Sequence, residues 1–178
     1  TMDTITLAGG CFWCLEAVFE LCDGVLSVES GYANGQVPRP SYEQVCRGDT
    51  GHAEVVQLRF DADRITLREL LQIFFHVHDP TTLNRQGNDV GTQYRSAIYW
   101  HDAEQERVAR ALVDELTRNG VFDAPLVTEL APLRNYYPAE AEHQRYFERH
   151  PHQGYCAYVI APKVQHFRQQ YASRLRRT

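Results

Sequence analysis

Three segments of the chain place apolar residues at the spacing of an amphipathic helix. The first covers residues 12–22, the second follows a capping box formed by Thr66 and Glu69, and the third follows the N-cap residue Asp102. These patterns predict three helices, each with one face turned to a hydrophobic core. The second pattern is the strongest, with apolar residues at i, i+3, i+4, i+7 and i+8: Leu67, Leu70, Leu71, Phe74 and Phe75.

Shorter apolar segments between these helices predict β-strands. They are bounded by glycine, asparagine and aspartate, which favour turns. Strands and helices mix along the chain in an order that predicts an α+β fold with one layer of helices on a mixed or antiparallel sheet. The expected strands cover residues 4–8, 25–32, 53–60, 95–100 and 126–130.

The remaining segments have no clear periodicity. Gly31–Gly51 and Asp79–Tyr94 are long, polar and rich in Gly, Asn and Tyr, and long irregular loops inside a compact domain are usually functional. Residues 139–149 are compatible with a short helix. The chain after Pro151 alternates poorly and ends in basic residues, so we expect a mobile C-terminal segment at 149–178 whose end is solvated.

The amino-acid composition is typical of a globular protein. The chain has 178 residues, 43% hydrophobic and 23% charged, which is enough for one sizeable core, and residues 1–178 are expected to form a single domain. The net charge of −5 argues against a nucleic-acid partner, since such proteins carry a basic excess. No apolar run is long enough to span a membrane, and no secretory signal is visible.

Five cysteines, four of them in the first quarter of the chain, suggest redox chemistry. An odd number does not favour a disulfide-stapled secreted domain, so we expect free thiols in the cytoplasm. Cys11 follows Gly9-Gly10 where a strand gives way to a helix, and a helix N-terminus lowers the pKa of a thiol. Cys11 is therefore expected to be a reactive nucleophile, or else a small residue filling a tight turn.

Residues next to Cys11 offer a pocket and a second thiol. Phe12 and Trp13 are either core residues or the walls of an apolar pocket beside the thiol. Cys11 and Cys14 have the spacing of a dithiol redox pair, or of half a zinc site. No second Cys-x-x-Cys pair completes such a zinc site, so no metal is expected.

Polar residues in three other segments are candidates for acid catalysis. Glu54 opens an apolar strand, either as a solvated strand end or as a carboxyl whose pKa burial raises, able to give a proton. Tyr42 and Tyr94 lie in the two long loops and can each donate a phenolic hydrogen bond, unless they are core tyrosines. Asp89 lies at the centre of the second loop.

Five motifs resemble those of the A-type peptide methionine sulfoxide reductases and occur in the same order. They span about residues 4–157, nearly the whole chain. Each motif alone is moderately specific, whereas the five together are strongly so. The motifs are Gly10-Cys-Phe-Trp13, Gly48-Asp-Thr-Gly-His-Ala-Glu54, Arg85-Gln-Gly-Asn-Asp89, Gly91-Thr-Gln-Tyr-Arg-Ser96 and Gly154-Tyr-Cys156.

This resemblance implies a fold and an activity. The fold is a two-layer α+β sandwich of ferredoxin-like type, and the activity is reduction of methionine-S-sulfoxide, free and in proteins, without metal or cofactor. Cys11 would attack the sulfur, Glu54 would protonate the oxygen, and Cys156 would resolve the sulfenic acid. Thioredoxin is implied as the reductant of the resulting disulfide, and a monomer is expected. Residues implied to bind the substrate are Phe12, Trp13, Tyr42, Asp89 and Tyr94.

Two departures from the family pattern leave the resolving route open. Many members have glycine where this chain has Cys14, and no cysteine follows Cys156. Resolution can therefore use Cys156, Cys14 or both in relay, and because a regular helix does not easily close a Cys-x-x-Cys disulfide, Cys156 is favoured for the first step. Cys22 and Cys46 are interpreted as structural. The main alternative function is a thioredoxin-like dithiol oxidoreductase that uses Cys11 and Cys14; a zinc or peptide-binding module is a third.

Overall fold

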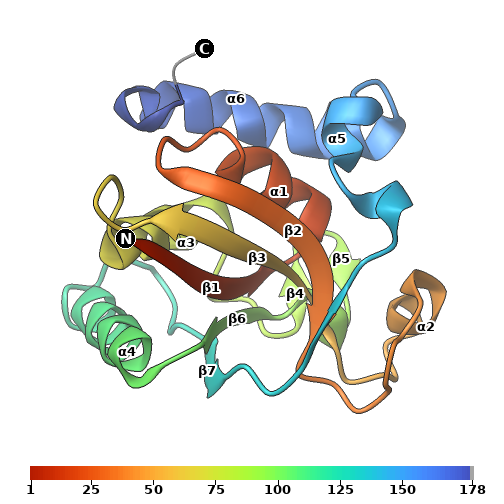
Figure 1. Ribbon diagram of the computed structural model, residues 1–178, viewed down its shortest axis with the longest axis horizontal. Coiled ribbons are helices and arrows are strands. Elements are labelled where there is room, and N and C mark those ends of the chain that lie inside the picture. The colour runs from red at the N-terminus through yellow and green to blue at the C-terminus, as the bar shows by residue number, and fades with distance from the viewer. Residues whose placement is uncertain (177–178) are drawn as a thin grey trace.

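The computed structural model describes residues 1–176 and is built around one six-stranded sheet (Figure 1). Its strand order is β7-β6-β1-β3-β2-β8, and neighbouring strands are antiparallel except β6 and β7, which are parallel. A separate hairpin consists of β4 and β5. The strands are β1 (Met2–Gly9), β2 (Val25–Ala33), β3 (Ala53–Asp61), β4 (Arg85–Gln86), β5 (Asp89–Val90), β6 (Ser96–Trp100), β7 (Glu129–Pro132) and β8 (Tyr136–Pro138).

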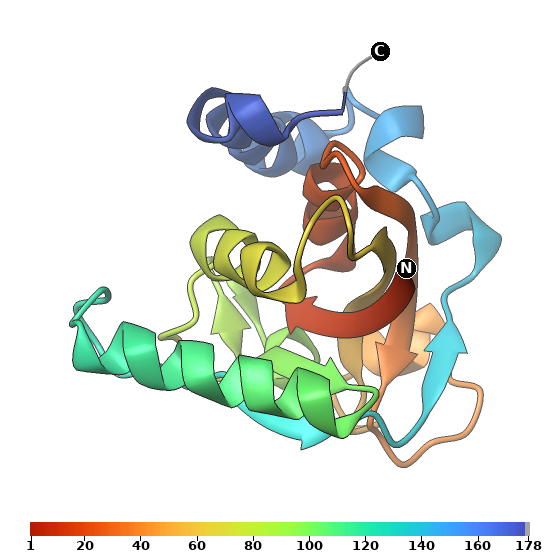
Figure 2. The ribbon, with the colours of Figure 1, turned by 60° about the vertical axis from the view of Figure 1, so that its left-hand side comes forward.

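Helices lie along the sheet and across one end of it (Figures 1 and 2). Thr66 and Glu69 form the expected capping box before α3, and the Asp102 side chain accepts a hydrogen bond from Gln105 N at the start of α4. The helices are α1 (Phe12–Phe19), α2 (Tyr42–Cys46), α3 (Leu67–Val77), α4 (Ala103–Arg118), α5 (Tyr146–Arg149) and α6 (Ala161–Gln170). Short 3-10 turns cover Thr92–Tyr94, Ala141–His143 and Ala172–Arg174, and a π-helical turn covers Cys156–Ile160.

The two faces of the sheet pack differently. On one face, residues such as Leu7, Leu58 and Ile98 join helices α1, α3 and α6 in the main core. The opposite face carries a smaller cluster made mostly of alanines with Tyr99. The strands of the sheet are strongly curved (Figure 2). Alternation of side chains along β1 and β3 produces this division, because successive residues point to opposite faces.

The predicted α+β class, with helices packed on one mixed sheet, is confirmed. Several segments differ from expectation. The first helix ends at Phe19 rather than Cys22, and the expected helix at 139–149 is two short turns, interrupted by Arg145 in a left-handed conformation (φ 53°). Strand β8 was not predicted.

Part of the C-terminal segment packs on the core. Its helix α6 lies against α1 and buries Val164 and Phe167. Tertiary packing provides this helix with its stability, since its apolar residues are few and its sequence periodicity is weak. In the described part of the chain, none of the helices combines the length and the hydrophobicity needed to cross a membrane.

The two long loops are folded rather than irregular. The first contains α2, and His52 holds it by accepting a hydrogen bond from Gly35 N at 3.1 Å and contacting Val37 O at 2.6 Å. The second contains the β4–β5 hairpin and the turn that ends at Tyr94. Both loops reach the N-terminus of α1, where the Tyr42 ring stacks on that of Phe12 and the Gln86 side chain lies against Gly10.

Candidate active site

Cys11 occupies the junction between β1 and α1. It is the N-cap residue of α1, with an extended backbone (φ −63°, ψ 127°), and its residue is only 7% exposed. Gly10 turns the chain into this position with φ 93°, and a Cβ on it would lie 2.6 Å from Gln86 Cγ. Glycine is therefore required at the turn that presents the Cys11 thiol.

The pKa of Cys11 departs from the sequence prediction. Burial raises it well above its ordinary value, and a hydrogen bond with the Cys14 thiol and the nearby charge of Glu54 add to the effect. The expected lowering by the N-terminus of α1 is wrong in direction, because loss of hydration outweighs the helix end for a buried anion. Cys11 is thus a thiol at neutral pH in the free protein.

Glu54 is a buried acid beside this thiol. It lies on β3 opposite Tyr32, is 1% exposed, and its Oε1 accepts a hydrogen bond from Phe12 N at 3.1 Å. Its Oε2 has no hydrogen-bond partner among residues 1–176. Burial is the main reason that the pKa of Glu54 is raised from 4.5 to about 8, so the carboxyl is protonated at neutral pH and can donate.

Three further polar residues surround Glu54. Burial and then the charge of Glu54 raise the pKa of both Tyr42 and Tyr94, which keeps their hydroxyls protonated as donors. Asp89 contributes its charge to the raised pKa of Glu54, and its Oδ2 accepts a hydrogen bond from Tyr155 at 2.6 Å. The structure therefore brings all three predicted residues to the same site from α2, the second loop and β5.

Aromatic rings form the other wall of the site. The Phe12 and Trp13 rings lie 6.5 Å apart, and each is 6.2 Å from the ring of Tyr42 in a stacked arrangement. Two rings from the C-terminal half complete the wall: Tyr146 stacks on Trp13 at 3.8 Å, and His143 lies 4.1 Å from Tyr42. Trp13 Nε1 has no partner in the part of the chain that the structure describes.

Sequence reasoning did not identify His143, Tyr146, Tyr155 or Glu140. Glu140 supports the wall by accepting hydrogen bonds from the Tyr32 hydroxyl at 2.8 Å and from Tyr42 N at 2.9 Å. Glu140 and His143 also form, with Glu142, a group whose ligand atoms lie within 4.8 Å of one another, but both Glu140 oxygens already have partners. The motif that ends in Cys156 was the one signal that pointed towards Tyr155.

The five cysteines divide into two groups. Cys11, Cys14, Cys22 and Cys156 are buried in the main core, whereas Cys46 is exposed. Cys22 is fully buried, as expected, and its thiol contacts Val18 O. All five are free thiols.

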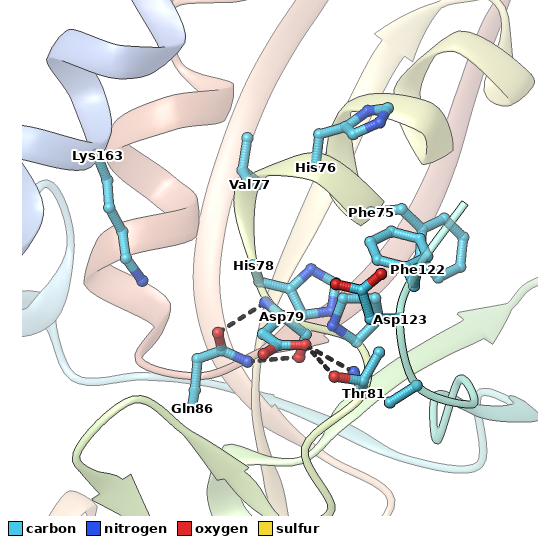
Figure 3. Close-up of a pocket in the computed structure, with 12 residues that line it drawn as sticks. Phe75, His76, Val77, His78, Asp79, Thr81, Gln86, Phe122, Asp123 and Lys163 are labelled. Carbon is cyan, nitrogen blue, oxygen red and sulfur yellow. Dashed lines mark hydrogen bonds between the residues drawn. The ribbon is translucent and has the colours of Figure 1, made fainter. Parts of the chain in front are cut away.

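A cavity of about 550 Å³ lies beside the site (Figure 3). It is lined by the end of α3, by Asp79, Gln86 and Lys163, and by the loop after α4. Gln86 accepts a hydrogen bond from Asp79 N and donates one to Asp79 O. The same side chain lies against Gly10, so it contacts both the cavity and the turn before Cys11. The predicted site residues are not among the described residues that line it.

The fold and this site define a class of protein. A thiol next to a protonated carboxyl, with phenol donors on one side and aromatic rings on the other, suits nucleophilic attack on a small polar group that must leave as a protonated species. Such an arrangement is typical of enzymes that use a cysteine nucleophile.

Comparison with known proteins gives the family. The profile described as "Peptide methionine sulfoxide reductase" matches residues 3–175. The peptide methionine sulfoxide reductase MsrA of Polynucleobacter asymbioticus is 55% identical over 173 residues, which is 97% of this chain and 91% of that protein. The reduced form of Mxr1 from Saccharomyces cerevisiae superposes with a TM-score of 0.82 and 39% identity, over 87% of this chain and 89% of that one. The protein belongs to the peptide methionine sulfoxide reductase family.

The same yeast protein has also been crystallised with a partner. The structure of Mxr1 from Saccharomyces cerevisiae in complex with Trx2 matches over 82% of this chain and 84% of that one, with a TM-score of 0.58 and 30% identity.

Proposed function

We propose that this protein reduces methionine-S-sulfoxide, free and in proteins, to methionine. Cys11 is the nucleophile, Glu54 is the proton donor, Cys156 resolves the oxidised Cys11, and thioredoxin reduces the disulfide. The observation that carries this proposal is the protonated Glu54 carboxyl, buried beside Cys11 with one oxygen unpartnered among the described residues.

The chemistry follows from the nature of a sulfoxide. Its oxygen is a poor leaving group unless it is protonated. As the Cys11 sulfur bonds to the sulfoxide sulfur, Glu54 gives a proton to the oxygen, which also takes the proton lost by Cys11, and the sulfur–oxygen bond breaks with release of water. Water then attacks the Cys11 sulfur and returns a proton to Glu54, and the bond between the two sulfurs breaks. Methionine is released, and Cys11 is left as a sulfenic acid, the first step of the cysteine oxidation ladder. No step requires a metal or a cofactor.

The aromatic wall of the site suits the methyl group of the sulfoxide, and the polar side suits its oxygen. Phe12 and Trp13 are proposed to hold the methyl group, since methyl and thioether groups pack favourably on aromatic rings. Tyr42 and Tyr94 are proposed to donate hydrogen bonds to the oxygen, with Asp89 shaping the polar side. The raised pKa of both tyrosines supports a donor role at neutral pH.

Resolution of the sulfenic acid requires a second thiol. Cys156 is proposed for it because it is buried in the same core cluster as Cys11, in a segment that shares contacts with the site through Tyr155. Thioredoxin is proposed as the reductant because a dithiol reduces a disulfide by thiol–disulfide exchange, and because the related Mxr1 forms a complex with Trx2.

We further propose the domain organisation, compartment and oligomeric state of the protein. Residues 1–178 are taken as one domain, and residues 149–178 as the part that moves when Cys156 reacts. Five free thiols are compatible with the reducing environment of the cytoplasm. The protein is proposed to act as a monomer.

The test is an assay with the two sulfoxide epimers separated. Purified protein with thioredoxin, its reductase and NADPH is given methionine-S-sulfoxide or methionine-R-sulfoxide, and methionine is measured. The S epimer is expected to react at least about 10²-fold faster, because the oxygen must point at Glu54 while the methyl group meets the aromatic wall. Equal rates, or preference for the R epimer, would contradict the proposal.

A further inference from the structure

Two buried side chains cover the glycine turn that precedes Cys11. A Cβ added to Gly9 would lie 3.0 Å from Cγ of His78, and one added to Gly10 would lie 2.6 Å from Cγ of Gln86. His78 is 7% exposed and Gln86 is 8% exposed. Because glycine has no side chain, both groups can lie directly against the main chain that leads into the proposed nucleophile.

The Gln86 side chain is itself held in place. Its Oε1 accepts a hydrogen bond from Asp79 N at 2.7 Å, and its Nε2 donates one to Asp79 O at 2.9 Å (Figure 3). Asp79 follows His78 directly in the chain. The ring of His78 is hydrogen-bonded to Phe74 O through Nδ1 and to the Ser96 hydroxyl through Nε2. The two side chains therefore form one connected support for the glycine turn, anchored at the end of α3.

Cys11 is fixed from its other side as well. The next backbone amide, Phe12 N, donates a hydrogen bond to Oε1 of Glu54 at 3.1 Å. The backbone around Cys11 therefore runs between two fixed points, the contact of Gly10 with Gln86 before it and this hydrogen bond after it. Together they set how the thiol lies relative to the proposed proton donor. Such placement matters, because moving a reacting group by about 1 Å can lower a rate by about 10²-fold.

Gln86 also belongs to the hairpin that carries Asp89. The two residues pair across β4 and β5, and Oδ2 of Asp89 accepts a hydrogen bond from the Tyr155 hydroxyl at 2.6 Å. One short hairpin thus supplies a residue of the polar side of the site and contacts the turn before the nucleophile. Gln86 is the residue through which the hairpin makes that contact.

We propose that Gln86 is a positioning residue for Cys11. Its side chain is held by the Asp79 backbone and packs on Gly10. This contact keeps the Cys11 thiol buried beside the Glu54 carboxyl. Gln86 acts through the main chain of the turn and gives neither a proton nor a bond to the reaction. The inference rests on the proposed function and adds to it a side chain that keeps the nucleophile and the proton donor in place.

The pKa of Cys11 provides a signature of this role. Burial is the main reason that this pKa is raised, with smaller effects from Cys14 on α1 and Glu54 on β3. If the turn relaxes, water reaches the thiol and its pKa falls towards the ordinary value. A side chain that only stabilises the fold has no such effect on the folded protein. The other titratable groups that face the thiol are unchanged in the test variants: Tyr42, Tyr94 and Tyr155.

The first test variant is Gln86→Ala, which removes the contact with Gly10. The rate of methionine formation from methionine-S-sulfoxide, with dithiothreitol as reductant, is expected to fall by about 10- to 10²-fold. The pKa of Cys11 is expected to fall as well. It is obtained from the pH dependence of alkylation by iodoacetamide, followed at Cys11 by peptide mapping. Asp79 is exposed, so water can replace both lost hydrogen bonds, and the circular dichroism spectrum should remain that of the folded protein.

A second variant, Gln86→Met, tests the contact itself. Methionine also has an unbranched side chain, which can lie against Gly10, but it cannot make the two hydrogen bonds to Asp79. Because the contact is kept, Gln86→Met is expected to recover most of the rate that Gln86→Ala loses, together with the wild-type pKa of Cys11.

Gln105→Ala is the matched control. Gln105 is 1% exposed and also joins two backbone groups, since it accepts a hydrogen bond from His101 N at 2.7 Å and donates one to Thr4 O at 2.6 Å. These contacts lie near the opposite end of β1 from the glycine turn. The variant is expected to lower the denaturation midpoint while the rate and the pKa of Cys11 stay those of wild type.

Three results would overturn the positioning role. The first is a folded Gln86→Ala with the wild-type rate and the wild-type pKa of Cys11. The second is a Gln86→Met that is as slow as Gln86→Ala, because the contact with Gly10 would then not be what matters. The third is an equal loss of rate in Gln105→Ala, which would tie the rate to stability. If wild type forms no methionine, the proposed function fails, and the pKa of Cys11 in Gln86→Ala still decides whether Gln86 holds the turn.

Discussion

Cys11→Ser is expected to lower the rate of methionine-S-sulfoxide reduction by roughly 10⁴- to 10⁶-fold, the scale seen when an enzyme loses its nucleophile. A serine hydroxyl is a far poorer nucleophile than a thiol, and it cannot carry the oxidising equivalent as a sulfenic acid. The rate of methionine formation with dithiothreitol as reductant measures the loss, because this reductant removes any dependence on Cys14 or Cys156.

The control for this variant is Cys22→Ser, which changes another buried thiol, three residues after the end of α1. It is expected to keep the wild-type rate. Serine fits the turn at Cys11, so the circular dichroism spectrum and the denaturation midpoint of Cys11→Ser should stay close to those of wild type. Activity of Cys11→Ser within about tenfold of wild type would contradict the assignment of the nucleophile.

Glu54→Gln is expected to lower the rate by about 10²- to 10⁴-fold, the range for loss of a general acid. Glutamine can still accept the hydrogen bond from Phe12 N but has no acidic proton to give. In wild type the rate should fall as pH rises through about 8, where Glu54 loses its proton, and this fall should be absent in the variant. Initial rates with saturating substrate between pH 6 and 9 measure both effects.

The same substitution should not destabilise the protein. The pKa of Glu54 is raised from 4.5 to about 8, so the folded state holds this proton more tightly than the unfolded state. Stability from this group is fully present below pH 4.5 and is lost as pH rises through about 8. Glu54→Gln removes that loss, and its free energy of unfolding should match or exceed that of wild type at pH 8.

Glu16→Gln is the matched control for Glu54→Gln. Glu16 is also buried, on α1, and burial raises its pKa to about 7, with no place in the proposed chemistry. The free energy of unfolding of Glu16→Gln should depend less on pH than that of wild type. Its rate, and the fall of that rate at alkaline pH, should be those of wild type. If the rate of Glu54→Gln still falls as pH rises through about 8, the proton donor is another group.

The elements that the sequence predicted well are those with a strong local pattern. The amphipathic helix at Leu67–Val77 begins at the predicted cap, and the strands at Val25–Ala33 and Ala53–Asp61 lie within a residue of their expected ends. Strand β8 and helix α6 have weak periodicity and depend on partners far along the chain. No local sequence pattern predicts such elements, because tertiary contacts stabilise them.

The same distinction applies to the site. Cys11 and Glu54 could be selected from local context, a helix start after two glycines and an acid in an apolar strand. His143 and Tyr146 complete the aromatic wall from a segment whose sequence carries no comparable signal. The pKa of Cys11 could not be predicted because its direction depends on burial and on neighbours, Cys14 and Glu54, that only the fold brings into place.

The central claim is that the oxidising equivalent of the sulfoxide passes to the cysteines of this chain. The most direct measurement treats reduced wild-type protein with one equivalent of methionine-S-sulfoxide, without reductant, and counts both methionine and free thiols. We expect about one methionine per chain and the loss of about two of the three thiols Cys11, Cys14 and Cys156. Methionine formed with all five thiols intact, or no methionine at all, would contradict the account.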